Sequence, residues 1–154
     1  MGLGKTIETI AFIAYLRTIR VMGPFLIIVP LSTYYNWRNE FKKWCPEVRL
    51  FMLRGIKERM HYNQERFKAQ DFDVIITSYE GCIREMSKLR KFFFKAIVID
   101  EAHRIKNEES ILATKIRCFN SLFRMLLTGT PMQNSLRELW ALLNYIFPDI
   151  FANA

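Results

Sequence analysis

The sequence predicts an α/β fold, a parallel β-sheet flanked by helices on both faces. Short apolar runs alternate with amphipathic stretches along the whole chain, which is the pattern of strands joined by helices. The runs are apolar throughout rather than at every second residue, as is typical of strands buried on both faces. Ligands of such sheets bind beyond the carboxyl ends of the strands, so functional residues are expected there.

The first part of the chain contains two expected helices with a strand between them. Apolar residues recur at helical spacing after Lys5, and this helix should end before Gly23-Pro24. The apolar run Phe25–Val29 then predicts a buried strand. Ser32 or Thr33 can cap the second helix. The buried face of that helix is expected to consist of Tyr34, Trp37, Phe41 and Trp44.

The rest of the chain continues the alternation. Four further strands are expected, at residues 48–53, 74–76, 96–99 and 125–127. The expected helices are an exposed charged one at 57–68, a short one from Tyr79, and two more at 111–119 and 136–146. The last helix should bury a stripe that consists of Leu136, Leu139, Trp140, Leu143 and Phe147.

Length and composition bound the class of protein. The 154 residues fit one domain, residues 1–154, and no second domain is expected. Hydrophobic residues make up 51% and charged residues 25%, which favours a globular fold over disorder. The apolar runs are far shorter than the roughly 20 residues needed to cross a bilayer, so no membrane partner is expected.

The net charge and the cysteine content restrict the kinds of partner and the cellular compartment that are expected. The formal net charge of +8 suits a polyanionic partner such as nucleic acid or a nucleotide, although an ordinary solvated surface explains it equally well. Three cysteines without a Cys-x-x-Cys pair and only two histidines argue against a disulfide scaffold or a zinc site. We therefore expect reduced thiols in the cytosol or nucleus.

A partial phosphate-binding motif opens the chain. Gly4-Lys5-Thr6 matches the last three positions of Gly-x-x-x-x-Gly-Lys-Ser/Thr, and Gly2 lies just ahead. In such a loop Lys5 would neutralise the phosphates of ATP, and the Thr6 hydroxyl would ligate Mg²⁺. The competing interpretation is a surface turn with a capping threonine, because the tripeptide alone is a weak signal.

The second motif, Asp100-Glu101-Ala102-His103, is more specific. It directly follows a strand, where Asp100 can hold Mg²⁺ and Glu101 can accept a proton from the attacking water. His103 can link the nucleotide site to neighbouring loops, or it can be an ordinary structural histidine. Metal-assisted hydrolysis of another substrate is a competing use of the two acids, but it leaves Lys5 and Thr6 unexplained.

Three polar segments are expected at one edge of the sheet. They are the acidic pair Asp100-Glu101, Thr77-Ser78 and the turn Thr128-Gly129-Thr130, each of which follows an expected strand. Because the carboxyl ends of parallel strands meet at the same edge, these segments should lie close together. A single site for phosphoryl transfer is therefore predicted, with catalysis by Lys5, Asp100 and Glu101.

With these motifs placed, the chain resembles the first RecA-like lobe of the SWI/SNF superfamily of chromatin-remodelling ATPases, most closely the imitation-switch group. The resemblance covers nearly the whole chain. The stretches that carry it are residues 1–6, 28–33, 36–41, 77–80, 99–107 and 126–134. It implies a RecA-like P-loop fold, ATP and Mg²⁺ as cofactors, and a nuclear, DNA-dependent ATPase that tracks along duplex DNA and remodels nucleosomes.

The resemblance also implies roles for individual residues. Those that would touch the DNA backbone are Pro30, Ser32, Thr33, Thr77 and Ser78. Thr128, Gly129 and Thr130 would couple hydrolysis to DNA contact. Gly2, Gly4, His103 and Gln133 would join Lys5 and Thr6 around the nucleotide, with Gln133 and Asn134 facing a second RecA-like lobe.

The chain departs from the family pattern in three respects. Leu31 stands where lysine is frequent, so one phosphate contact is absent. The first strand and adenine-reading segment would fall before Met1, and the second lobe lies outside the chain. Either Met1 is not the native start or the stability is low, and we expect a truncated gene model or an excised fragment. No appreciable turnover is expected from the chain alone. A non-catalytic protein- or DNA-binding fragment and an RNA helicase lobe are the alternatives.

Overall fold

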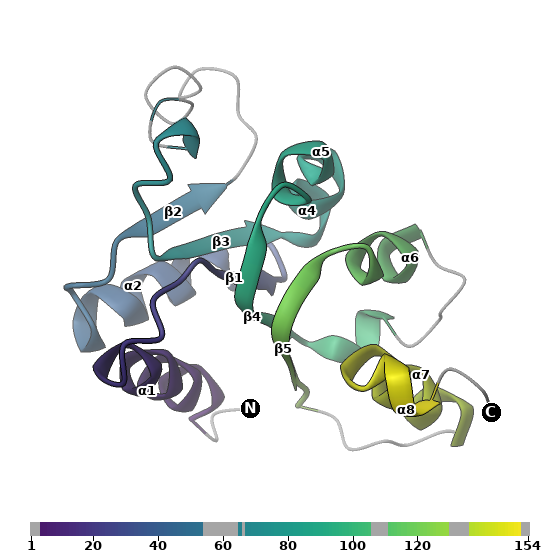
Figure 1. The fold of residues 1–154 in the computed structure, drawn as a ribbon. Coiled ribbons are helices and arrows are strands. Elements are labelled where there is room, and N and C mark those ends of the chain that lie inside the picture. Colours follow the sequence, from purple (N-terminus) through teal and green to yellow (C-terminus); the bar gives the residue numbers. More distant parts are fainter. Residues whose placement is uncertain (1–3, 54–64, 66, 106–110, 130–135, 152–154) are drawn as a thin grey trace.

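The structure, a computed structural model, describes residues 4–53, 65, 67–105, 111–129 and 136–151. Its centre is a five-stranded parallel sheet with the strand order β2-β3-β1-β4-β5 (Figure 1). The strands are β1 (Phe25–Val29), β2 (Leu50–Leu53), β3 (Val74–Ser78), β4 (Phe93–Asp100) and β5 (Asn120–Leu127). The fold class predicted from the sequence, a parallel sheet flanked by helices, is confirmed.

The register of the sheet aligns the ends of its strands. Ile28 near the end of β1 lies opposite both Thr77 of β3 and Ile99 of β4. Asp100, the last residue of β4, lies opposite Leu127, the last residue of β5. The ends of these four strands and the residues that directly follow them form what we call the carboxyl edge of the sheet.

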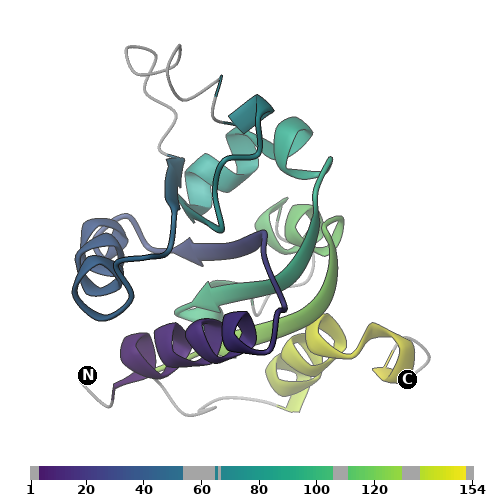
Figure 2. The same ribbon diagram turned by 60° about the vertical axis from the view of Figure 1, so that its left-hand side comes forward.

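Helices cover both faces of the sheet (Figures 1 and 2). The first face carries α1 (Lys5–Thr18) and α2 (Tyr34–Trp44), which bury Ile13, Trp37 and Phe41 against it. The other face carries α4 (Tyr79–Arg84), α5 (Met86–Leu89), α6 (Ile111–Arg117) and α7 (Leu136–Ile146), followed by α8 (Pro148–Phe151). Strands β1 and β3 are buried along their whole length because they lie between these two layers.

Phenylalanine dominates part of the apolar core between the sheet and helices α4, α5, α6 and α7, which we call the second core. Neighbouring rings there pack with centroids 5.1 to 6.2 Å apart, within the range of favourable aromatic pairs. The rings belong to Phe51, Phe67, Phe72, Phe92, Phe94 and Phe119. They connect the segment before β3 to β2 and β4.

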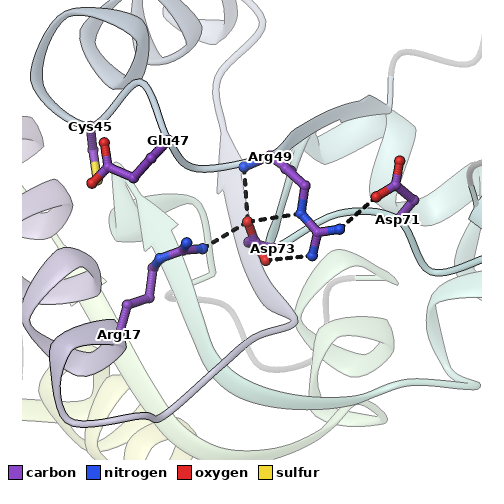
Figure 3. Close-up of polar contacts among 6 residues, drawn as sticks. All are labelled: Arg17, Cys45, Glu47, Arg49, Asp71 and Asp73. Carbon is purple, nitrogen blue, oxygen red and sulfur yellow. Dashed lines mark hydrogen bonds and ion pairs between the residues drawn. The ribbon is translucent and has the colours of Figure 1, made fainter.

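A cluster of four charged residues lies at the opposite, amino edge of the sheet (Figure 3). Asp73, just before β3, accepts hydrogen bonds from the backbone and guanidinium of Arg49 and pairs with Arg17 of α1 at 2.7 Å. Arg49 also reaches Asp71 at 2.6 Å. Burial alone would raise the pKa of Asp73, but the bonds from Arg49 and Arg17 outweigh it and hold that pKa at about 2. The amino-edge cluster therefore fastens the end of α1 to the start of β3.

Several expected elements agree with the structure, and two apolar faces do not. In α2, Trp44 is exposed rather than buried, because its indole N–H donates to Glu40 at the solvent side of the helix. In the stripe predicted for α7, Leu136 is 85% exposed and Phe147, which follows the helix, is 49% exposed. The other three residues, Leu139, Trp140 and Leu143, are only half-buried, so the predicted buried stripe is wrong. The buried residues of α7 are Ala141, Leu142 and Tyr145.

The strand β5 forms one edge of the sheet among the described strands. Leu122 and Phe123 of this strand are 71% and 43% exposed. That a further strand precedes Met1 stays a prediction. The charged helix expected at 57–68 lies largely outside the described residues.

Two remaining expectations concern cysteines and membranes. Cys45, Cys82 and Cys118 are free, with the first two buried. Burial raises the pKa of the Cys82 thiol to about 12, so this group stays protonated. Within the described segments, no helix combines the length and apolarity that crossing a bilayer requires.

Candidate active site

The two sequence motifs meet at the carboxyl edge. Lys5 begins α1, and its Nζ lies 3.7 Å from Oε1 of Glu101, which follows β4. Figure 2 shows the N-terminal end of α1 on the side to which the arrowheads of β1 and β4 point. Gly4 precedes the helix with a φ of 79°, a left-handed conformation that glycine adopts without strain. The turn therefore needs glycine to aim the start of α1 at the acidic pair.

Glu101 occupies an unusual backbone conformation. Its φ is 53°, in the left-handed region that few residues other than glycine adopt. Such strain is concentrated at functional sites, where the surrounding structure holds it in place. The turn directs the Glu101 side chain between Lys5 and His103, whose Nδ1 lies 3.3 Å from Oε2. His103 is thus placed beside the acidic pair, as predicted.

Asp100 is held by neutral donors. Its side chain is buried, and Oδ2 accepts a hydrogen bond of 3.0 Å from the indole Nε1 of Trp37. Oδ1 accepts one of 3.0 Å from the backbone N–H of Glu101. Across the described part of the chain, no cationic side chain pairs with this carboxylate. About half of the acceptor capacity of the Asp100 carboxylate is therefore left for a further partner.

Tyr79 contacts the backbone of the same turn, at Asp100 and Glu101. Its hydroxyl donates a hydrogen bond to the carbonyl oxygen of Asp100 and lies 3.2 Å from that of Glu101. Burial, together with the negative charge of Asp100, raises the pKa of Tyr79 well above its usual range. The phenol is therefore a permanent donor to the backbone that carries the acidic pair.

Gly129 lies close to the side chains of Lys5 and Glu101. A Cβ atom at this position would lie 3.2 Å from Lys5 Nζ and 3.6 Å from Glu101 Oε1. A larger residue would thus fill the space beside the charged pair. Of the three segments predicted to meet at the sheet edge, those of Glu101 and Gly129 converge here, and Lys5 at the start of α1 joins them. Gly2, Thr130 and Gln133 lie outside the described residues, so their predicted roles stay predictions.

The residues expected to touch DNA divide into two groups. Ser32 is exposed and Thr33 is partly exposed, both between β1 and α2. Thr77 and Ser78 are buried, and their hydroxyls already have partners within the chain. Thr77 donates to the carbonyl of Leu53, and Ser78 caps α4 by accepting from the N–H of Gly81. Contact of these five predicted residues, Pro30 included, with DNA stays a prediction.

Two site residues were not identified from the sequence. Trp37 was assigned to the buried face of a helix, and Tyr79 to the start of another, with no polar role for either. A buried indole or phenol usually finds an acceptor, which is the signal that could have marked them. Sequence spacing does not name that acceptor, since Trp37 lies 63 residues from Asp100.

The arrangement fits a nucleotide and a divalent cation. The positive end of α1, Lys5 and the space beside Gly129 are suited to phosphate groups. Among the described residues, no group of three or more acidic, histidine or cysteine side chains could hold a metal ion. The Asp100 carboxylate has acceptor capacity left beyond its bonds from Trp37 and Glu101, which suits Mg²⁺, a cation usually held by one or two protein groups together with phosphates and water.

The parallel sheet with polar groups at its carboxyl edge is the arrangement of a RecA-like lobe. Comparisons with known proteins agree with this class and narrow it. The profile of the SNF2-related domain matches residues 1–154. The chain belongs to the SNF2-related domain family.

Relatives of the chain carry names that describe remodelling ATPases. The ISWI chromatin-remodeling complex ATPase ISW1 of Saccharomyces cerevisiae is 55% identical over 100% of this chain and 14% of its own length. The human SWI/SNF-related matrix-associated actin-dependent regulator of chromatin subfamily A member 1 is 50% identical, over 100% of this chain and 15% of its own. The chain therefore spans about a seventh of these relatives.

A solved structure has the same fold. The SWI2/SNF2 ATPase core of Sulfolobus solfataricus, in complex with double-stranded DNA, matches with a TM-score of 0.83 and 34% identity. The match covers 96% of this chain and 30% of that one. The chain is thus similar to part of an ATPase core, and the RecA-like fold implied by the resemblance is confirmed.

Proposed function

We propose that this chain is the ATP-binding lobe of a DNA-dependent ATPase that moves along duplex DNA and remodels nucleosomes in the nucleus. The observation that carries the proposal is the convergence of Lys5, Glu101 and Gly129 beside the unneutralised carboxylate of Asp100. Family membership and the names of the relatives support it. The second RecA-like lobe of the complete protein is the proposed partner across this edge.

Different residues of the site have different roles in phosphoryl transfer. Bound ATP with Mg²⁺ would supply the group to be transferred and a divalent charge that stabilises it. The Lys5 ammonium and the N–H groups at the start of α1, after Gly2 and Gly4, bind phosphate. The Thr6 hydroxyl and the Asp100 carboxylate hold the metal, Asp100 through water.

Glu101 is the proposed general base. In the structure its carboxylate pairs with Lys5 and His103. When Lys5 turns to phosphate, Oε1 of Glu101 becomes free to accept a proton from water. His103 orients the same carboxylate through Oε2. Gln133 faces the nucleotide and the second lobe.

Two segments at the carboxyl edge provide the proposed contact with DNA, the one that follows β1 and the end of β3. Pro30, Ser32 and Thr33, with Thr77 and Ser78, bind the sugar-phosphate backbone, which gives affinity without sequence preference. Thr128, Gly129 and Thr130 couple these contacts to hydrolysis, because Gly129 lies against both Lys5 and Glu101. We expect residues 1–154, tested without the proposed second lobe, to bind nucleotide without appreciable turnover.

The experiment compares Glu101→Gln with wild type in the protein that contains both lobes. We expect DNA-stimulated ATP hydrolysis to be lost while ATP binding is retained, because the amide cannot accept the proton. Glu65→Gln, at an exposed position outside both sequence motifs, is the control and should hydrolyse ATP normally. Hydrolysis is measured with duplex DNA and with RNA.

Three outcomes contradict the proposal in different ways. Retained turnover in Glu101→Gln would place the base elsewhere. Stimulation by RNA but not by duplex DNA would identify an RNA helicase lobe. A wild-type protein that binds DNA yet shows no stimulated hydrolysis would be a non-catalytic binding protein.

A further inference from the structure

Two aromatic side chains connect the proposed DNA-contacting segments to the acidic pair. Trp37 lies in α2, which follows Pro30, Ser32 and Thr33. Tyr79 directly follows Thr77 and Ser78 at the start of α4. Both donate to Asp100, Trp37 to the carboxylate and Tyr79 to the backbone carbonyl. Each of the two segments is thus joined to the same residue.

We propose that Trp37 and Tyr79 are positioning residues that hold Asp100 for Mg²⁺ and make its placement depend on bound DNA. This inference rests on the proposed function. Neither residue touches the reacting groups; both act through the orientation of Asp100 and the turn at Glu101.

The connection through Trp37 consists of consecutive hydrogen bonds. The Thr33 N–H and hydroxyl donate to the Pro30 carbonyl at 3.1 and 3.2 Å. The Trp37 backbone N–H donates to the Thr33 carbonyl at 3.0 Å, and its indole reaches Asp100 Oδ2 at 3.0 Å. The indole is 1% exposed and packs against Phe41, so it cannot turn away without disturbing the core. A shift of the loop before α2 is therefore passed to the carboxylate.

The connection through Tyr79 acts on the backbone. Ser78 caps α4 through its hydroxyl, which fixes the first turn that carries Tyr79. The phenol then bonds the two successive carbonyls of Asp100 and Glu101. These carbonyls belong to the two peptide groups on either side of the Glu101 Cα atom, and the φ of 53° at Glu101 sets the direction of its side chain. Tyr79 therefore stabilises the strained turn that separates the metal-holding acid from the base.

The chain contains a matched control for each residue. Trp44 lies on the same helix and also donates its indole N–H to a carboxylate, that of Glu40 at 2.9 Å, but at an exposed position. Tyr145 is buried in the same core as Tyr79, and its hydroxyl has no hydrogen-bond partner among the described residues. Trp44→Phe and Tyr145→Phe thus repeat the two chemical changes away from the site.

The test uses Trp37→Phe and Tyr79→Phe in the two-lobe protein. Each keeps an aromatic ring and removes one donor. We expect the Mg²⁺ concentration for half-maximal hydrolysis to rise and the stimulation by duplex DNA to fall, each by about tenfold, the lower range for partners that orient a metal ligand. Binding of a fluorescent ATP analogue should weaken in Mg²⁺ and stay unchanged in EDTA. Trp44→Phe and Tyr145→Phe should match wild type in all measurements.

A purely structural role predicts a different pattern. Trp37→Phe would then lower the thermal unfolding temperature and leave the Mg²⁺ requirement and the DNA stimulation as in wild type, which would overturn the inference. If Trp37→Phe does not fold, Tyr79→Phe decides by the same criteria. Mg²⁺-dependent analogue binding needs no turnover, so it tests the positioning role even if wild-type hydrolysis fails to respond to DNA and refutes the proposed function.

Discussion

Asp73 and Asp100 are buried carboxylates at opposite edges of the same parallel sheet, and their partners differ in charge. Asp73 at the amino edge is neutralised by the guanidinium groups of Arg17 and Arg49 (Figure 3). Asp100 at the carboxyl edge is held by an indole and a backbone N–H. A carboxylate matched by cations of its own chain stabilises the fold. A carboxylate that is held only by neutral donors has no counter-charge among the described residues and can bind a cationic ligand.

The largest effect is expected from Asp100→Asn. The substitution keeps the shape of the side chain but removes the charge that we propose for metal binding. ATP hydrolysis by the two-lobe protein should fall by about a thousandfold, the scale seen when one preorganised electrostatic contact is lost from an active site. The thermal unfolding temperature should fall less than in Asp73→Asn, because the amide oxygen can still accept one of the two N–H donors that hold Asp100. Retained hydrolysis would contradict the proposed role of Asp100. An unfolding temperature as low as that of Asp73→Asn would contradict the difference between the two carboxylates.

The reverse pattern is expected from Asp73→Asn. This change leaves Arg17, which is largely buried, without its counter-charge, and should lower the free energy of unfolding by about 3 kcal/mol. Urea denaturation of the chain measures it. Asp71→Asn is the control, because its half-exposed ion pair should contribute at most about 1 kcal/mol. Equal effects at Asp71 and Asp73 would show that burial of the pair is unimportant.

A smaller effect is expected from pH. The pKa of Asp73 is about 2 in the folded chain, below its ordinary value of 3.8. A lowered pKa means that the ionised form stabilises the fold, so this contribution is complete above about pH 4 and is lost as the pH falls through about 2. The shift corresponds to about 2 kcal/mol.

The pH prediction is measured as a difference between two proteins. Urea denaturation of wild type and Asp73→Asn at pH 6, 4, 3 and 2 should give free energies of unfolding that converge toward the lowest pH. A constant difference across this range would show that ionisation of Asp73 is not the source of the stabilisation.

Much of the fold could be predicted because the relevant signals are local. The run Phe25–Val29 is a strand with the predicted bounds, and α7 begins and ends where its helical pattern does. The buried face of α7 could not be predicted, since Leu136 and Phe147 are as apolar as the residues that are buried. The position of α7 against the second core decides which of them meet solvent.

The candidate site shows the same division. Lys5, Asp100 and Glu101 were identified because their motifs are contiguous, and the meeting of the acidic pair with the segment of Gly129 followed from the parallel sheet. The amino-edge cluster was not identified. Arg17, Arg49 and Asp73 carry no motif, and only the packing of α1 beside the start of β3 brings them together.

The sequence alone therefore determined the class of fold, the edge at which ligands bind and the polar groups available there, because periodicity and contiguous motifs are properties of neighbouring residues. The tertiary structure decided which carboxylate is neutralised and which is held only by neutral donors. That depends on partners far away in the chain, such as Trp37 for Asp100 and Arg17 for Asp73, whose contacts exist only once the helices have packed on the sheet.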